Sequence, residues 1–92
     1  MIEVIYDSKQ KARKDYRDDS AEFVRDGLDY LKEMATFSEL RAIARLKANN
    51  WKILKGQVYT RQVNKMDGDV YTFRSLPEIA ALCHKHKLYP ED

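Results

Sequence analysis

Apolar side chains recur at the spacing of an α-helix over residues 21–35. A helix turns about 100° per residue, and at that angle these apolar positions fall on one face. Asp19 or Ser20 is suited to cap the first turn, whereas Gly27 is a weak helix former inside the segment. The pattern predicts a first helix over 21–35 with one buried face, formed by Phe23, Val24, Leu28, Leu31 and Met34.

A second helix is predicted over residues 36–48. Thr36 and Glu39 have the spacing of a capping box, in which each side chain accepts a hydrogen bond from the other residue's backbone N–H. Asn49 and Asn50 tolerate the left-handed conformation that ends many helices. The apolar arc of this helix consists of Phe37, Leu40, Ile43, Ala44, Ala48 and Trp51, and the next arc, which we expect to face outward, carries Arg41, Arg45 and Asn49.

Two further segments have the pattern of β-structure. Residues 2–6 are rich in β-branched and aromatic side chains and predict a short strand, whereas the charged residues 8–19 are typical of a loop or arm. After Ile53 and Leu54, a hairpin is predicted with strands at 57–64 and 69–74. Its turn at 65–68 contains Asp-Gly, a pair that tolerates positive φ.

The C-terminal segment predicts a third helix. Ser75, Leu76, Pro77 and Glu78 have the spacing of a second capping box, with proline at a position that needs no N–H. The helix is expected to run to about Lys87 and Pro90 to close the chain. One face of this helix carries Ile79, Leu82, Cys83 and His86.

Together these elements predict one α+β domain over residues 1–92: a short N-terminal strand, two helices, a β-hairpin and a C-terminal helix. Two helices followed by a two-stranded wing is also the order of elements in a winged helix. The predicted core consists of Phe23, Leu28, Leu31, Phe37, Leu40, Ile43, Trp51, Ile53, Tyr71, Phe73, Ile79 and Leu82.

The composition excludes several classes of protein. Ninety-two residues support one modest core, and 43% hydrophobic with 35% charged residues is typical of a globular chain. We expect no membrane partner, because no apolar run approaches the ~18 residues that span a bilayer, and the N-terminus lacks the basic and apolar regions of a secretory signal. Cys83 is the only cysteine, which predicts a reducing, cytoplasmic setting.

The net charge of +2 hides a strong segregation of charge. Residues 40–66 hold seven Lys or Arg and no Asp or Glu, whereas residues 18–39 hold seven acidic groups against two basic ones. A one-signed face attracts an oppositely charged partner even when the net charge is small. The sequence therefore predicts a binding surface formed by Arg41, Arg45, Asn49, Lys52, Lys55, Tyr59, Arg61 and Lys65.

The partner of that surface remains open between three interpretations. Nucleic acid is favoured by the basic helix and hairpin, since lysine and arginine contact phosphates and asparagine can bond to bases. A protein with an acidic surface is the second, in which the chain acts as an adaptor or an inhibitor of a host enzyme or nucleoprotein complex. A solvated face without a partner is the third. The acidic helix could also mimic nucleic acid towards a DNA-binding enzyme.

Patterns that suggest chemistry have simpler explanations. Cys83 and His86 share a helix face, but a closed zinc site needs four ligands and the chain has one cysteine and two histidines. We expect Cys83 to be an inert core thiol and His86 to benefit from the helix dipole. The carboxylates of the first helix are expected to be solvated: Asp18, Asp19, Glu22, Asp26, Asp29 and Glu33. We therefore expect no enzyme, no cofactor, no metal and no small-molecule substrate.

Three segments carry a resemblance to a known family. Residues 11–17 (KARKDYR), 53–59 (ILKGQVY) and 67–79 (DGDVYTFRSLPEI) resemble parts of small treble-clef zinc-finger proteins of phages and prophages. Where that pattern has two Cys-x-x-Cys pairs, this chain has Asp18 and Ala21, then Leu76 and Ile79. The resemblance implies a zinc-free treble-clef-like core with a helical insertion, a phage or mobile-element origin, and an adaptor for nucleic acid or protein.

Overall fold

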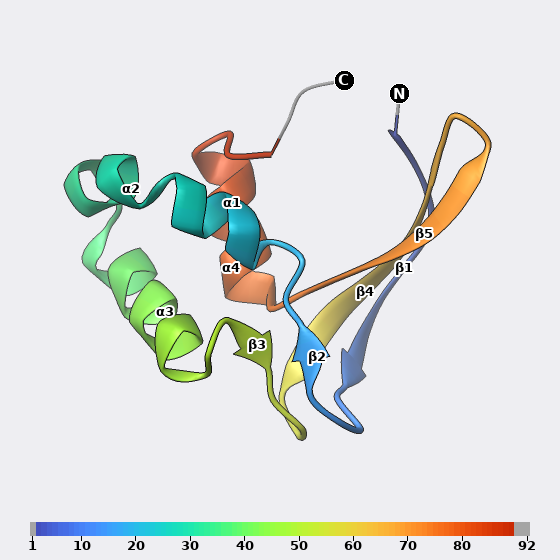
Figure 1. The fold of residues 1–92 in the computed structure, drawn as a ribbon, viewed down its shortest axis with the longest axis horizontal. Helices are drawn as coiled ribbons and strands as arrows, with labels where there is room; N and C mark the ends of the chain where they lie inside the picture. The colour runs from blue at the N-terminus through green and yellow to red at the C-terminus, as the bar shows by residue number, and fades with distance from the viewer. Residues whose placement is uncertain (1, 90–92) are drawn as a thin grey trace.

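A three-stranded antiparallel sheet and a group of four short helices lie side by side in the computed structural model, which describes residues 2–89 (Figure 1). The central strand β4 (Val58–Met66) pairs with β1 (Ile2–Lys11) on one side and β5 (Asp69–Ser75) on the other. A separate two-stranded ladder joins β2 (Tyr16–Arg17) to β3 (Lys52–Ile53). The predicted α+β class and the order strand, helices, hairpin, helix are confirmed.

The N-terminal strand is longer than predicted. Residues 8–11 continue β1 instead of forming a loop, and Ser8 lies opposite Arg61 while Lys11 lies opposite Val58. The predicted loop also contains β2. Strand prediction depends on apolar alternation, whereas an edge strand can be held by backbone hydrogen bonds alone and often carries charge. Because residues 8–11 are all polar or charged, their pattern did not predict a strand.

The predicted hairpin is confirmed. Its loop is the two residues Asp67 and Gly68, with φ of 51° and 88°, and Met66 lies directly opposite Asp69. Positive φ at both central positions is the requirement of the tight turn whose twist matches that of the strands. Because the turn is this short, β4 extends two residues beyond the predicted 57–64, to Met66.

The first predicted helix is two helices, α1 (Ala21–Asp26) and α2 (Leu28–Met34), so the prediction of one continuous helix is wrong. Gly27 separates them, and a Cβ on it would lie 3.1 Å from a methyl carbon of Leu88. The C-terminal segment therefore packs against Gly27 at a distance that a side chain at this position would obstruct. Of the predicted face, Val24 and Leu31 are buried, whereas Met34 is exposed.

The second predicted helix is confirmed as α3 (Phe37–Ala48), with both hydrogen bonds of the Thr36–Glu39 capping box present. Asn50 adopts the left-handed conformation, with φ of 57°, as predicted. The predicted apolar arc is correct for Ile43, which is buried, and for Leu40 and Trp51, which pack against the core. It is wrong for Phe37, which is 72% exposed, and for the exposed Ala44 and Ala48, whereas Ala42 and Leu46, outside the arc, are buried. Glu39 lies on the buried side and made that side look polar in the sequence.

The last helix is α4 (Pro77–Lys85), two residues shorter than predicted, and Lys87 after it has φ of 54°. The second predicted capping box is wrong, because Leu76 is the N-cap residue and no side chain caps the helix from that position. The predicted face is confirmed, with Ile79, Leu82 and Cys83 buried and the side chain of His86 7% exposed. Pro90 lies outside the described residues.

The core lies between the helices and the near half of the sheet. Leu31, Ile43, Ile53, Ile79 and Leu82 of the predicted core are buried, and Phe23, Leu28, Leu40 and Trp51 are partly buried against them. Tyr71 and Phe73 are half-buried, and Phe37 is not in the core. Buried apolar residues outside the predicted set are Ala12, Ala21, Val24, Ala42, Leu46, Tyr59, Leu76 and Cys83. Among residues 2–89, no helix is long and apolar enough to cross a membrane.

Candidate basic binding surface

Two turns that are distant in the sequence meet at one end of the molecule, at the bottom of Figure 1. The turn between β1 and β2 is joined to the turn between β3 and β4 by backbone hydrogen bonds from Ala12 N–H to Gln57 O and from Gly56 N–H to Ala12 O, both 2.8 Å. Asp15 adds a third link, since its Oδ1 accepts the N–H of Lys55 at 2.8 Å. These bonds fix the two turns against each other.

Seven cationic side chains lie on these two turns and on the ends of the strands that flank them, and we call this surface the basic end. All seven are exposed. Asp15 is the only carboxylate in residues 9–17 and 52–57, and one of its oxygens is used by the Lys55 N–H. A shallow concavity of about 520 Å³ lies among residues 10–13. The basic end consists of Lys9, Lys11, Arg13, Lys14, Arg17, Lys52 and Lys55.

Further positive charge surrounds Tyr16, which lies at the same end. The guanidinium of Arg74 is 4.6 Å from the centre of the Tyr16 ring, and Lys14 Nζ is 5.6 Å from it. Arg61 lies directly opposite Arg74 in the β4–β5 pairing, so two cations are neighbours on one face of the sheet. The Nε of Arg74 is buried and has no hydrogen-bond partner among the described residues.

The structure brings only part of the predicted binding surface together. Lys52 and Lys55 belong to the basic end, and Arg61 lies on the sheet beside it. Lys65 is near the far end of β4, next to the hairpin turn. Because a strand rises about 3.3 Å per residue, Lys65 lies roughly 30 Å along the chain from Lys55. These residues therefore do not form one patch.

The remaining predicted residues lie elsewhere or are inaccessible. Arg41 and Arg45 are exposed on α3 as expected, and the Arg41 guanidinium lies 4.7 Å from the centre of the exposed Phe37 ring. Asn49 is the half-buried C-cap of α3. Tyr59 is 3% exposed and packs 5.5 Å from the ring of Tyr16, so its predicted place on the binding surface is wrong. Its neighbours in the core come from segments far away in the sequence.

Two of the acidic residues that we expected to be solvated accept hydrogen bonds from the backbone, and one of the two is buried. Asp18 is fully buried, and its two oxygens accept the N–H of Ser20 at 2.9 Å and of Leu76 at 3.0 Å. Asp19 Oδ2 accepts the N–H of Arg74 at 2.8 Å. Burial raises the pKa of Asp18, although the hydrogen bonds from Leu76 and Ser20 act in the opposite direction. The segment before α1 is therefore fastened to the end of β5 and the start of α4.

Glu39 joins α3 to α4 in a similar way. Besides closing the capping box, its carboxylate lies 3.2 Å from His86 Nε2 and 3.2 Å from Lys85 Nζ. The hydrogen bond from the Thr36 N–H, followed by those from His86 and Lys85, lowers the pKa of Glu39 to about 2. His86 thus contacts a carboxylate on α3, which the sequence did not predict.

Cys83 faces the core, as predicted. Burial raises the pKa of its thiol to about 12, so it is protonated at neutral pH, and thiols are nucleophiles only as thiolates. Nearby, the hydroxyls of Ser20 and Tyr89 lie 2.5 Å apart. No group of three or more His, Cys, Asp or Glu within residues 2–89 has the arrangement of a metal site.

The positions where the treble-clef pattern has cysteines lie together in the fold. Asp18, Ala21, Leu76 and Ile79 are all buried, and Asp18 is joined to the Leu76 N–H. No protein-family model, curated protein or solved structure matches this chain. The resemblance to treble-clef proteins therefore stays a prediction.

Sequence reasoning missed five of the seven residues of the basic end: Lys9, Lys11, Arg13, Lys14 and Arg17. A local pattern was present, because residues 9–17 contain five cations and one carboxylate. The segment was interpreted as a loop or arm, and nothing near it in the sequence indicates that it docks against residues 52–57.

Proposed function

We propose that this chain is a non-enzymatic nucleic-acid-binding protein with an accessory or regulatory role, and that the basic end is its binding surface. The observation that carries the proposal is that two segments distant in the sequence, with seven exposed cations on their turns and flanking strand ends, are joined by hydrogen bonds between the turns. Nucleic acid supplies a row of phosphates, each of which a lysine or arginine side chain can contact. Each contact releases counterions, which contributes a large part of the affinity.

The fixed backbone beneath these cations supports the proposal. The turn segments are held by three hydrogen bonds of 2.8 Å, so the cations are displayed from a defined surface. Arg61 and Arg74 extend the positive charge onto the sheet. Like charges directly opposite each other destabilise a sheet, and an anion between them removes that repulsion.

The test is a titration of a fluorescently labelled oligonucleotide at about 50 and 200 mM salt. In the basic-end variant, Lys11, Arg13 and Lys14 are all replaced with Gln. We expect its affinity to fall at least about tenfold at low salt and the slope of log K against log salt to decrease by about 2, since each phosphate contact contributes about 0.7 to 0.9.

A matched control removes the same charges elsewhere, by replacing Lys32, Arg45 and Lys47 with Gln. All three are exposed on α2 and α3. We expect a change of less than about threefold, because these three side chains lie on the helices and not on the two turns or their flanking strands, and salt screens exposed charges that do not contact the ligand. Equal losses in the two triple variants, or no salt-dependent binding by the parent protein, would refute the basic end as the binding surface.

A second candidate function, a protein-binding adaptor or inhibitor, is favoured by a different surface. Tyr30, Met34 and Phe37 are 47%, 58% and 72% exposed around the corner between α2 and α3, and Arg41 stacks on Phe37. Aromatic residues, Met and Arg are the types enriched at protein interfaces. If this function is correct, Phe37→Ser abolishes capture of a partner protein that the parent chain retains, while the basic-end variant still captures it.

A further inference from the structure

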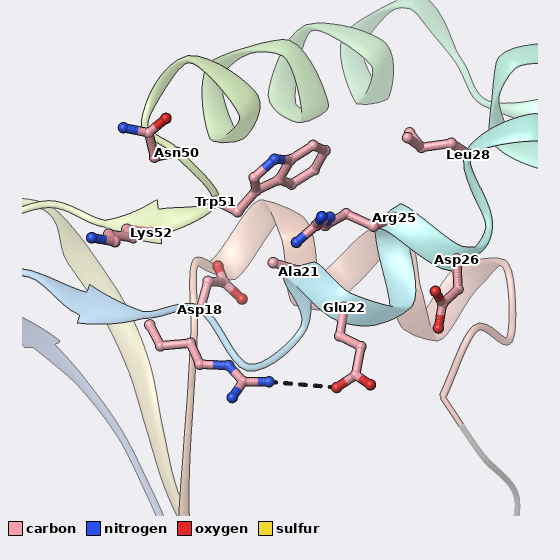
Figure 2. A pocket seen from close by; sticks show the side chains of 10 residues that line it. Asp18, Ala21, Glu22, Arg25, Asp26, Leu28, Asn50, Trp51 and Lys52 are labelled. Atoms are coloured by element: carbon pink, nitrogen blue, oxygen red, sulfur yellow. Dashed lines mark hydrogen bonds and ion pairs between the residues drawn. The ribbon is translucent and has the colours of Figure 1, made fainter.

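An open groove of about 770 Å³ adjoins the basic end and contains the only tryptophan of the chain. Figure 2 shows the Trp51 ring between α3 and α1, with Arg25 and Leu28 towards one end of the groove and Asn50 and Lys52 towards the other. The indole is partly buried against the core and its remaining surface faces the groove. The guanidinium of Arg25 is 5.4 Å from the ring centre.

The backbone holds Trp51 in an unusual conformation. Asn50 and Trp51 have φ of 57° and 62°, and positive φ in a residue as bulky as tryptophan is rare. The turn is fixed by the bond from the Trp51 N–H to Leu46 O at 2.8 Å, so the ring is placed by the end of α3. Such strain persists only where the surrounding structure enforces it, and it is concentrated at functional sites.

The charges of the groove are arranged in two groups. Arg17 and Lys52 lie directly opposite each other in the β2–β3 ladder, and both are exposed at the rim shared with the basic end. The second group consists of three carboxylates, Asp18, Glu22 and Asp26. Asp18 is buried and accepts hydrogen bonds from backbone N–H groups, and Glu22 Oε2 lies 3.5 Å from Arg17. The groove thus combines an aromatic surface with donors and acceptors beside a cationic rim.

We infer that this groove binds an unpaired nucleobase stacked on Trp51, with the adjoining phosphates held by Arg17 and Lys52, so that the nucleic acid bound by the basic end is single-stranded. The inference rests on the proposed function. A stacked base needs an exposed ring face, which single strands offer at every nucleotide and a duplex does not. The guanidinium of Arg25 lies over the Trp51 ring, so a base that stacks on the ring has to displace it, and the displaced guanidinium is suited to contact the other face of that base.

Trp51 is its own reporter, because its fluorescence is the only tryptophan fluorescence of the chain. We expect saturable quenching of this fluorescence by oligothymidylate or oligouridylate of about 15 nucleotides, the upper range of site sizes for one small domain. A duplex of equal length should bind at least about tenfold more weakly and leave the fluorescence unchanged. The two oligonucleotides also distinguish DNA from RNA.

Trp51→Leu keeps apolar packing and removes the stacking surface. Its affinity for the labelled single strand should fall about 5- to 150-fold, the effect of losing one stacked base. Trp51→Phe should lose less, and Tyr30→Leu, which removes an exposed ring that does not line the groove, should lose nothing. Circular dichroism checks that the variants are folded. The fluorescence of the parent protein tests the inference even if Trp51→Leu does not fold.

The outcomes separate the two proposals. Equal binding of duplex and single strand without a change in tryptophan fluorescence would overturn the groove as a base site and leave the basic end intact. If the basic-end variant instead binds the single strand with the affinity of the parent protein and shows the same quenching of tryptophan fluorescence, the basic end is not the binding surface. No binding of any oligonucleotide at low salt would overturn both.

Discussion

The carboxylates of the helical half and the cations of the basic end are used in opposite ways. Asp18, Asp19 and Glu39 accept hydrogen bonds from backbone N–H groups and hold elements together. The cations of the basic end are exposed, and Arg17 alone among them has an ion pair within the described side chains, with Glu22. The carboxylates of the first region therefore stabilise the fold, whereas the cations of the second are exposed to solvent or to a partner.

This difference teaches that a net charge of +2 describes neither region. A buried carboxylate that is bonded to amide groups cannot reach out to neutralise a lysine on the surface. The carboxylates that hold elements together therefore do not act as counterions of the basic end, where the exposed Glu22 pairs with Arg17. Substitutions of the first group should act on stability, and substitutions of the second should act on binding.

Asp18→Ala should give the largest effect on stability. It leaves the buried N–H groups of Ser20 and Leu76 without an acceptor, which is expected to lower the free energy of unfolding by about 2–4 kcal/mol. Urea denaturation followed by circular dichroism measures it. Asp26→Ala, at an exposed position of the same charge, should change stability by less than about 0.5 kcal/mol. Similar losses of unfolding free energy in the two variants would show that the hydrogen bonds of Asp18 do not stabilise the fold.

Glu39→Gln should have the next largest effect on stability. It weakens the capping box and the contacts with Lys85 and His86, which we expect to lower the free energy of unfolding by about 1–2 kcal/mol at pH 7. Ser38→Ala, at an exposed position beside it, is the control and should be nearly neutral.

The pH dependence of this effect has a definite sign. The pKa of Glu39 is lowered from 4.5 to about 2 in the folded chain, so its stabilisation is complete above the unfolded value and is lost as the pH falls towards 2. The pKa of Asp18 is raised, so its ionisation has the opposite effect on stability. The difference between parent and Glu39→Gln isolates Glu39, and it should shrink between pH 4.5 and 2. A difference that is constant across this range would contradict the role of the carboxylate.

The same contrast explains how much could be predicted from the sequence. The capping box of Thr36 and Glu39 and the turn at Asp67 and Gly68 are encoded within four residues, and both were predicted. The burial of Asp18 depends on Leu76, 58 residues away, and no local pattern contains that contact. Phe37 is exposed on α3 whereas the side chain of Glu39 is largely covered, the reverse of what the apolar pattern alone indicates.

The candidate site divides in the same way. Lys52 and Lys55 were predicted because residues 40–66 lack carboxylates. Their neighbours were missed, because the bond that joins Asp15 to Lys55 spans 40 residues. Charge counted along the chain finds a basic segment, and only the docking of the two turns makes that segment part of a surface.

Arg61→Gln should show that the positive charge beside the basic end opposes stability. Arg61 and Arg74 are directly opposite in the sheet, so removing one cation is expected to raise the free energy of unfolding by about 0.5 kcal/mol. Lys9→Gln, opposite the neutral Thr60, should leave stability unchanged. Chemical denaturation of both variants measures the difference, and destabilisation by Arg61→Gln would mean that the arginine is used by the fold.

Glu22→Gln gives the smallest effect on stability and the sharpest separation of the two uses of charge. Its contact with Arg17 is exposed on both sides, 62% and 74%, and such pairs contribute less than about 0.5 kcal/mol. Because the substitution frees Arg17 and removes a negative charge from the groove, affinity for a single-stranded oligonucleotide should rise about two- to fivefold. Glu33→Gln makes the same change on α2, away from the groove, and should leave affinity unaltered. If both variants gain equally, net charge alone governs binding; if Glu22→Gln loses affinity, Glu22 itself contacts the ligand, and its pairing with Arg17 does not restrain binding.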